Sequence, residues 1–255
     1  MSSKKSKTLI LSSYFSKKPH PNDPSDTDVI GRGVDGHVPS SSFGYIKNWY
    51  ESIISKNLNG VIFHDSLTDD FIDKYSNDNV TFIKVGDSQY SNNDFRFYCF
   101  FDYLNSLNLE PDCVFHADVS DVVVTKDPAP LIHDNPSVDY FTCKDSIKLK
   151  DFPYVDLHEK VNWDEMLLFL LNQNDWDLIN MGVIGGSYEN MLTFYKTFVS
   201  IRDDLKNPEF NADMWICQYI LRSQLQPCEL MIGDPVCSEF KKYQTKRKDV
   251  YFIHK

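Results

Sequence analysis

The residues with the clearest chemical potential lie between 112 and 128, where two carboxylates follow an apolar run. The run at 113–115 is typical of a buried strand, and Asp118 and Asp121 come just after it. Carboxylates at the end of a buried strand are costly unless a positive charge compensates them. Mg²⁺ and Mn²⁺ do so well, because they prefer carboxylate and phosphate oxygens. Ligands of open α/β sheets bind beyond the carboxyl ends of the strands. The stretch therefore predicts a metal site that carries a diphosphate, and the alternative is a solvated acidic turn.

A single arginine interrupts the apolar segment 93–104, which is predicted to be a largely buried helix. A buried guanidinium group needs an anionic partner. Arg96 is therefore expected either to form an internal ion pair with an aspartate or to contact a nucleotide or the acidic stretch. The sequence leaves both alternatives open.

Two further polar groups stand beside predicted helix starts. Asn180 lies in the glycine-rich segment 176–187, whose glycines permit close backbone approach and whose Ser187 is a good N-cap. Asp213 lies in the first turn of a helix expected to open at Asn211. An acid at that place also has a purely structural explanation, because it interacts favourably with the helix dipole.

The chain ends on a predicted strand at 249–253, followed by His254 and Lys255. An imidazole and an ammonium group at a strand end are suited to binding a metal and a phosphate. The alternative is a frayed terminus.

The elements that must position these groups alternate between strands and helices. Strands are predicted at 8–13, 61–63, 80–85 and 113–115, and helices at 43–57, 69–75 and 93–104. Such alternation predicts an α/β fold with a Rossmann-like, mostly parallel central sheet and helices on both faces.

Other segments are less regular. Residues 16–42 are rich in Pro, Asp, Gly and Ser, which predicts a long loop whose Arg32 and His37 either face a substrate or are solvated. A strand is predicted at 140–143. The region 144–176 is mixed, contains Trp163 and a helical stretch across 166–170, and is expected to form one wall of an acceptor cleft.

Composition excludes several classes of protein. The 255 residues carry a net charge of −11, which argues against a general nucleic-acid binder. Hydrophobic residues make up 42% of the chain, which is enough for a sizeable core. No apolar run is long enough for a signal peptide or a transmembrane segment, so a soluble, cytoplasmic protein is expected.

The six cysteines form no C-x-x-C pair. Buried free thiols are expected rather than a zinc site or disulfides.

The acidic stretch, Asp-x-x-Asp-Val-Val-Val-x-x-Asp-Pro over 118–128, resembles the metal motif of the GT-A nucleotide-sugar glycosyltransferases. The family usually has Asp-x-Asp, whereas Ser120 stands at that spacing here and Asp121 lies one residue further on. The order of the opening strand, the arginine helix, Asn-x-Gly-Val-x-Gly-Gly, the Asp213 helix and His-Lys is also similar to the family. The resemblance covers most of residues 8–255. It implies one GT-A domain over 1–255, with the nucleotide-binding part at 8–128 and the acceptor part at 129–255.

The resemblance also implies roles for individual residues. The expected ligands of Mn²⁺ or Mg²⁺ are Asp118, Asp121 and His254. The expected contacts to the donor nucleotide and its diphosphate are Ser12, Tyr14, Arg96, Asp118 and Lys255. Asn180 and Asp213 are expected near the transferred sugar, with Asp213 as general base if the reaction inverts configuration. The implied activity moves a sugar from a nucleotide-diphosphate sugar, with UDP favoured, to a hydroxyl of a glycan or other acceptor.

Two rival functions remain at this point. A nucleotidyltransferase or sugar-nucleotide pyrophosphorylase has a similar sheet but requires a glycine-rich, basic loop after the first strand, where this chain has Ser12-Ser13-Tyr14-Phe15. A non-catalytic carbohydrate-binding protein of the same fold is the other. Metal-dependent hydrolysis of a nucleotide sugar separates an enzyme from a binder.

Overall fold

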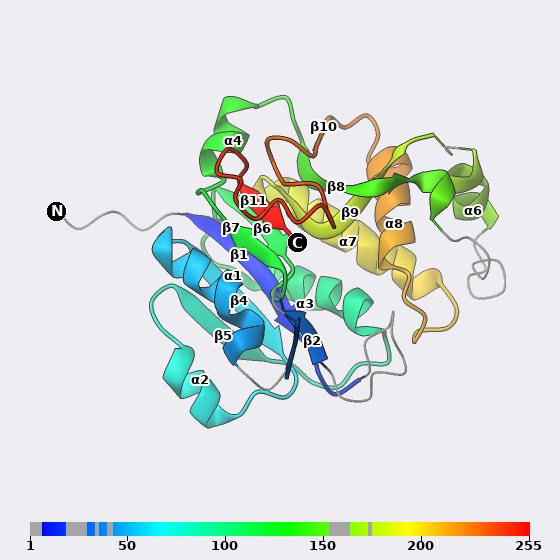
Figure 1. Cartoon of the computed structure of the whole chain (residues 1–255). Coiled ribbons are helices and arrows are strands. Elements are labelled where there is room, and N and C mark those ends of the chain that lie inside the picture. Colours follow the sequence, from blue (N-terminus) through cyan, green and yellow to red (C-terminus); the bar gives the residue numbers. More distant parts are fainter. Residues whose placement is uncertain (1–6, 19–29, 34–35, 40–42, 153–163, 173–174) are drawn as a thin grey trace.

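The computed structural model describes residues 7–18, 30–33, 36–39, 43–152, 164–172 and 175–255 (Figure 1). Its centre is a seven-stranded sheet in the order β10-β8-β9-β6-β1-β4-β5. These strands are β1 (Thr8–Tyr14), β4 (Asn59–His64), β5 (Val80–Lys84), β6 (Cys113–Ala117), β8 (Tyr140–Lys148), β9 (Asp177–Gly186) and β10 (Leu230–Ile232). Only β9 runs antiparallel to its neighbours, β6 and β8. The prediction of an α/β fold with a mostly parallel sheet is confirmed.

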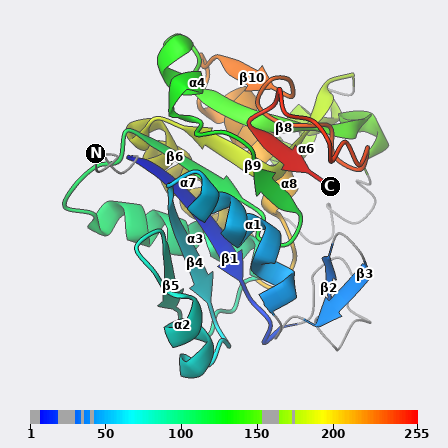
Figure 2. The same ribbon diagram turned by 60° about the vertical axis from the view of Figure 1, so that its left-hand side comes forward.

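Helices cover both faces of the sheet (Figures 1 and 2). One layer contributes to the core around Trp49 and contains α1 (Phe43–Ser55), α2 (Asp69–Tyr75) and α4 (Ala129–Asp134). The other contributes to the core around Phe97 and contains α3 (Asn92–Ser106), α6 (Asp164–Leu171), α7 (Tyr188–Asp204) and α8 (Asp213–Tyr219). Two short turns, η1 (Leu149–Asp151) and η2 (Ile220–Gln224), complete the helical elements of the described residues.

The strand β1 shows why this sequence forms a sheet with two buried faces. Leu9 and Leu11 contribute to the core on one side, and Ile10 contributes to the core on the other. All three are at most 6% exposed. Successive side chains of a strand point to opposite faces, so a continuous apolar run requires cover on both sides.

Two small ribbons lie outside the main sheet. β7 (Val122–Val124) pairs with β11 (Phe252–His254) in antiparallel register, so the last strand returns to the acidic stretch. β2 (Ile30–Gly33) and β3 (Gly36–Pro39) form a hairpin (Figure 2). The prediction of an irregular loop across 16–42 is wrong for these two strands. Arg32 and His37 are register partners in this hairpin, and only their backbone is described.

Some predicted details are confirmed and others required correction. The glycines of 176–187 lie within β9, and a Cβ at Gly182 or Gly185 would come within 2.1 Å of a neighbouring side chain, so the predicted close approach is confirmed, as is the Ser187 cap of α7, which accepts a hydrogen bond from the Asn190 amide. The N-cap of α8 is Ala212, not Asn211. Trp163 lies outside the described residues, so that part of the predicted acceptor wall has no structural description.

The cysteine prediction is wrong for two of the six residues. Cys143 on β8 and Cys237 form a disulfide, and the free cysteines are Cys99, Cys113, Cys217 and Cys228. The two partners are 94 residues apart in the sequence. No local spacing pattern could therefore have indicated the pair, and only the fold brings it together.

In the described part of the chain, no helix has both the length and the apolar character needed to cross a membrane.

Candidate metal centre

Three strand ends bring together the predicted metal ligands. Asp118 directly follows β6, and Asp121 directly precedes β7. His254 lies on β11 opposite Val122, the residue after Asp121, in the antiparallel register of the two strands. The fold thus places a residue from the end of the chain beside the acidic stretch, which excludes the frayed-terminus alternative for His254.

The three side chains form a compact cluster. One ligand atom from each of Asp118, Asp121 and His254 lies within 4.8 Å of the other two. The Nε2 atom of His254 is 3.4 Å from Oδ2 of Asp121, and the imidazole is 1% exposed whereas the Asp121 side chain is 26% exposed. Nδ1 of His254 has no hydrogen-bond partner among the described residues, and Nε2 has only this ion-pair contact to Asp121. A buried imidazole without a regular hydrogen bond, beside two partly exposed carboxylates, fits a divalent cation reached from solvent.

Gly182 on β9 makes room for this cluster. Its carbonyl oxygen accepts a hydrogen bond of 2.8 Å from the amide of Asp118. A Cβ atom on Gly182 would lie 2.1 Å from Cε1 of His254 and 3.0 Å from Oδ2 of Asp118. Only glycine therefore permits the imidazole and the carboxylate to approach β9 this closely.

Arg96 connects the acidic stretch to the protein interior. From α3, its guanidinium group donates to Oδ1 of Asp118 at 2.5 Å and to Oδ2 of Asp213 at 3.0 Å. The side chain of Arg96 is 9% exposed. The two alternatives left by the sequence are thus combined, because Arg96 forms an internal ion pair and also contacts the acidic stretch.

Asp213 is held inside the protein rather than presented to solvent. Its carboxylate accepts from Arg96 and from the backbone amide of Met214, and the residue is 2% exposed. Burial raises the pKa of Asp213, while the Arg96 guanidinium group opposes that rise. In this geometry Asp213 orients Arg96, and its contact to a sugar hydroxyl stays a prediction.

Asn180 is likewise engaged by neighbouring protein groups. Its side-chain amide donates to Oδ2 of Asp145 at 3.0 Å, and its side-chain oxygen accepts from the amide of Gly182 at 2.8 Å. Asn180 thus fixes the β9 backbone that supports His254. Sequence reasoning missed Asp145, which is 8% exposed. Asp145 lies two residues beyond the strand predicted at 140–143, in the part by which β8 continues to Lys148, and its nearness to that strand was the available signal.

The predicted nucleotide contacts on β1 are core residues. The hydroxyl of Ser12 is buried and donates to the carbonyl of Ala117 at 2.6 Å, which ties β1 to the end of β6. Tyr14 is 3% exposed and packs edge-on against Tyr45. The prediction that these two side chains face a bound donor is not supported by their positions. The backbone amide of Lys255 donates to the carbonyl of Asp121 at 3.1 Å, which anchors the terminus beside the cluster.

A cavity of about 270 Å³ lies beyond the carboxyl ends of β1, β4 and β5. Its lining includes Phe15, Lys17, Asp65, Asp87 and Asn92. Asn92 begins α3, and Arg96, which contacts Asp118, lies one turn further along the same helix, so α3 links the cavity to the acidic stretch. This cavity was not predicted, although Lys17 and Lys18, shortly after the strand predicted at 8–13, were a usable signal.

Comparison with protein-family models finds no match for this chain, and comparison with curated proteins finds no relative of significant similarity.

A pH dependence follows from the His254 environment in the metal-free protein. Burial opposes protonation, but the carboxylates of Asp121 and Asp118 prevail and raise the pKa of His254 above its usual value. Because the pKa of His254 is higher in the folded than in the unfolded state, protonated His254 adds to the free energy of unfolding. This contribution is fully present below about pH 6.5 and is lost as the pH rises through the folded-state pKa. A metal ligand must be the neutral imidazole, so we expect Mn²⁺ affinity to increase with pH over the same range.

Melting temperatures and Mn²⁺ titrations at about pH 5 to 8 check this expectation. His254→Gln should flatten both pH profiles. His133→Gln, at a side chain that is 90% exposed, is the matched control. Mn²⁺ affinity that is independent of pH in the parent protein would contradict the assignment of His254 as a ligand.

Proposed function

We propose that this chain is a GT-A-type glycosyltransferase that uses a divalent cation and a nucleotide-diphosphate sugar, with UDP as the favoured nucleotide. The observation that carries the proposal is the convergence of Asp118, Asp121 and His254 at the carboxyl end of β6. Two carboxylates and one imidazole suit Mn²⁺, and hard carboxylate oxygens also suit Mg²⁺. The location agrees with the general rule for ligands of open α/β sheets.

The cavity beyond β1, β4 and β5 supports the donor assignment. Phe15 supplies an aromatic surface, packed against Phe95 at a ring-centroid distance of 5.2 Å. Asp87, which is ion-paired with Lys17 at 2.6 Å, is an exposed carboxylate for ribose or base hydrogen bonds, whereas Asp65 holds the backbone amides of Ser16 and Lys17. A nucleoside in this cavity would direct its diphosphate along α3 toward the metal cluster.

The roles of the surrounding residues follow from their contacts. Asp118, Asp121 and His254 would hold the cation, which would supply Lewis-acid stabilisation of the charge on the leaving nucleoside diphosphate. Arg96 fixes the orientation of Asp118, and Asp213 fixes Arg96. Asn180 fixes the Gly182 backbone against which the cluster packs. In this proposal Asn180 and Asp213 are positioning residues, and the half-buried Lys255 adds positive charge beside the diphosphate.

A panel of nucleotide sugars, screened for thermal stabilisation with and without Mn²⁺, is the first experiment. The nucleotide sugar that stabilises most is then incubated with the protein. Mn²⁺-dependent release of a nucleoside diphosphate and free sugar supports a glycosyltransferase. Formation of a nucleoside triphosphate from the nucleotide sugar and pyrophosphate instead indicates a pyrophosphorylase, and Mn²⁺-independent binding without hydrolysis indicates a carbohydrate-binding protein.

Asp121→Asn provides a site-specific prediction. The amide keeps the shape of the side chain but removes the charge that attracts the cation, so Mn²⁺ affinity should fall by about 10-fold or more. Donor hydrolysis should fall at least in parallel. Asp134→Asn, at an exposed acid on α4, should change neither quantity. Calorimetric Mn²⁺ titration of both variants measures the effect, and equal affinities would remove Asp121 from the ligand set.

A further inference from the structure

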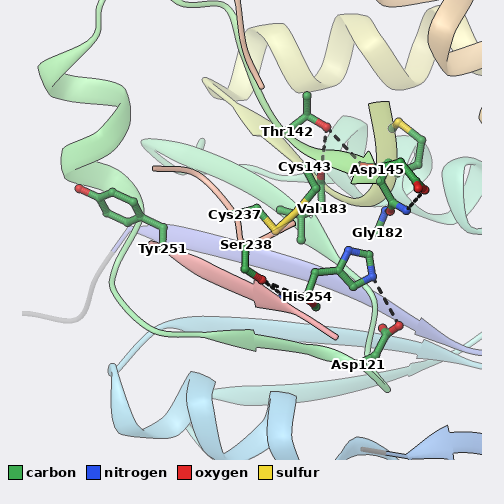
Figure 3. Close-up of a disulfide and its surroundings, with 12 residues drawn as sticks. Asp121, Thr142, Cys143, Asp145, Gly182, Val183, Cys237, Ser238, Tyr251 and His254 are labelled. Carbon is green, nitrogen blue, oxygen red and sulfur yellow. Dashed lines mark hydrogen bonds and ion pairs between the residues drawn. A yellow bond between two sulfur atoms is a disulfide. The ribbon is translucent and has the colours of Figure 1, made fainter. Parts of the chain in front are cut away.

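The disulfide and the metal cluster share a neighbour. One ligand atom from each of Cys143, Cys237 and His254 lies within 4.8 Å of the other two, and all three residues are buried. His254 therefore belongs both to this sulfur-containing group and to the group with Asp118 and Asp121. Figure 3 shows the imidazole with the disulfide on one side and Asp121 on the other.

The two groups differ in the ions that they suit. Carboxylate oxygens suit Mg²⁺ and Mn²⁺, whereas two thiolates and an imidazole are a typical donor set for Zn²⁺. We propose that, when the Cys143–Cys237 disulfide is reduced, the two thiols and His254 form a second, buried metal site for a thiophilic divalent ion of the zinc class.

The redox step balances with an external dithiol as reductant. The dithiol supplies two electrons and two protons, the S–S bond breaks, two thiols form, and the dithiol becomes a disulfide. Binding of the ion then releases the thiol protons to solvent. The Cα atoms of Cys143 and Cys237 are 5.2 Å apart, so rotation of the two side chains can separate the sulfurs by the about 4.6 Å at most that two sulfurs on one zinc ion span.

The backbone near the cysteines is held independently of the disulfide. The backbone amide of Cys237 donates to the carbonyl of Gly233 at 3.1 Å. The backbone amide of Ser238 donates to the carbonyl of Phe252 at 3.0 Å. The hydroxyl of Ser238 accepts from the amide of His254 at 2.9 Å. These bonds keep Cys237 and His254 in place after reduction.

The second site competes with the first for His254. A neutral imidazole has one lone pair on its ring nitrogens, so it binds one ion at a time. An ion held by the cysteines therefore leaves Asp118 and Asp121 without their third ligand. The thiol site itself is independent of the proposed transferase activity, and only this competition rests on the proposed metal centre.

Co²⁺ titration of the full chain tests the site, because thiolate ligation gives a cobalt charge-transfer absorption that oxygen ligands do not give. We expect the reduced protein to gain this absorption at one equivalent and the oxidised protein to show none. Cys228→Ser and Asp121→Asn should retain it in the reduced protein, and Cys237→Ser should lose it. No absorption in the reduced protein, or absorption that survives Cys237→Ser, overturns the proposal.

A Mn²⁺ titration tests the competition. The reduced protein loaded with one equivalent of Zn²⁺ should bind Mn²⁺ about 10-fold or more weakly than the oxidised protein. If the oxidised protein binds no Mn²⁺, the proposed metal centre fails while the cobalt result still decides the thiol site. Unchanged Mn²⁺ affinity in the zinc-loaded protein, with the cobalt signal present, overturns the sharing of His254.

Discussion

Arg96→Ala is expected to reduce the free energy of unfolding by about 3–5 kcal/mol, because it removes the cation that two carboxylates share inside the protein. Asp213 is 3% exposed at its side chain and would remain buried without its guanidinium partner. The buried carboxyl of Asp94 raises the cost, since its charge and that of Asp213 repel each other. The opposing cation nearest Asp94 is Arg202, which is bound to it at 2.6 Å and cannot replace Arg96.

Urea denaturation measures this loss. Arg96→Lys should retain part of the stability, because one ammonium group cannot reproduce the two-pronged contact to Asp118 and Asp213. Lys47→Ala is the matched control. Lys47 faces Glu51 at 3.9 Å on the exposed side of α1, and such a pair contributes at most about 1 kcal/mol. A loss for Arg96→Ala no larger than the control would contradict the buried network.

Gly182→Ala is expected to disrupt the proposed metal centre without adding a polar group. The new methyl would lie 2.7 Å from Nε2 of His254 as well as 2.1 Å from Cε1, so the imidazole must move. Overpacking of this kind costs about 1–3 kcal/mol. Displacement of a ligand should lower Mn²⁺ affinity by about 10-fold or more.

Gly86→Ala is the control for Gly182→Ala, since no atom lies within 4 Å of a Cβ at Gly86. Its stability should change by no more than about 0.5 kcal/mol and its Mn²⁺ affinity should stay the same. Thermal melting establishes that both variants fold, and Mn²⁺ titration compares them. A folded Gly182→Ala protein with parental affinity would show that His254 is not a ligand.

The parallel half of the fold was predictable because each strand is a short apolar run between segments of helical spacing. The run at 113–115 and the arginine in 93–104 placed Asp118 and Arg96 at the correct strand end and on the correct helix. The expected grouping of Asp118, Asp121 and His254 is confirmed as a geometric cluster. The spacing of apolar residues locates the strands and helices in the sequence. In a parallel sheet, the polar residues that follow each strand lie at the same edge, so they can be expected to form one site.

Other features depend on contacts that no local pattern encodes. The Cys143–Cys237 pair joins β8 to a segment 94 residues away. The glycines of β9 indicated close approach but not its partner, which for Gly185 is Phe115, because a Cβ there would lie 2.1 Å from that ring. Tyr14 was expected to face a ligand, yet Tyr45 covers it. Sequence shows which residues are polar or small, whereas only the packed structure shows which neighbour they meet.

The central claim is that a divalent cation held by Asp118, Asp121 and His254 binds the donor diphosphate. Calorimetric titration of UDP into the oxidised protein, with Mn²⁺ and then with EDTA, tests it most directly. The account predicts binding that requires Mn²⁺ and that Asp121→Asn weakens by about 10-fold or more. Equal UDP affinity in EDTA and in Mn²⁺ would contradict it.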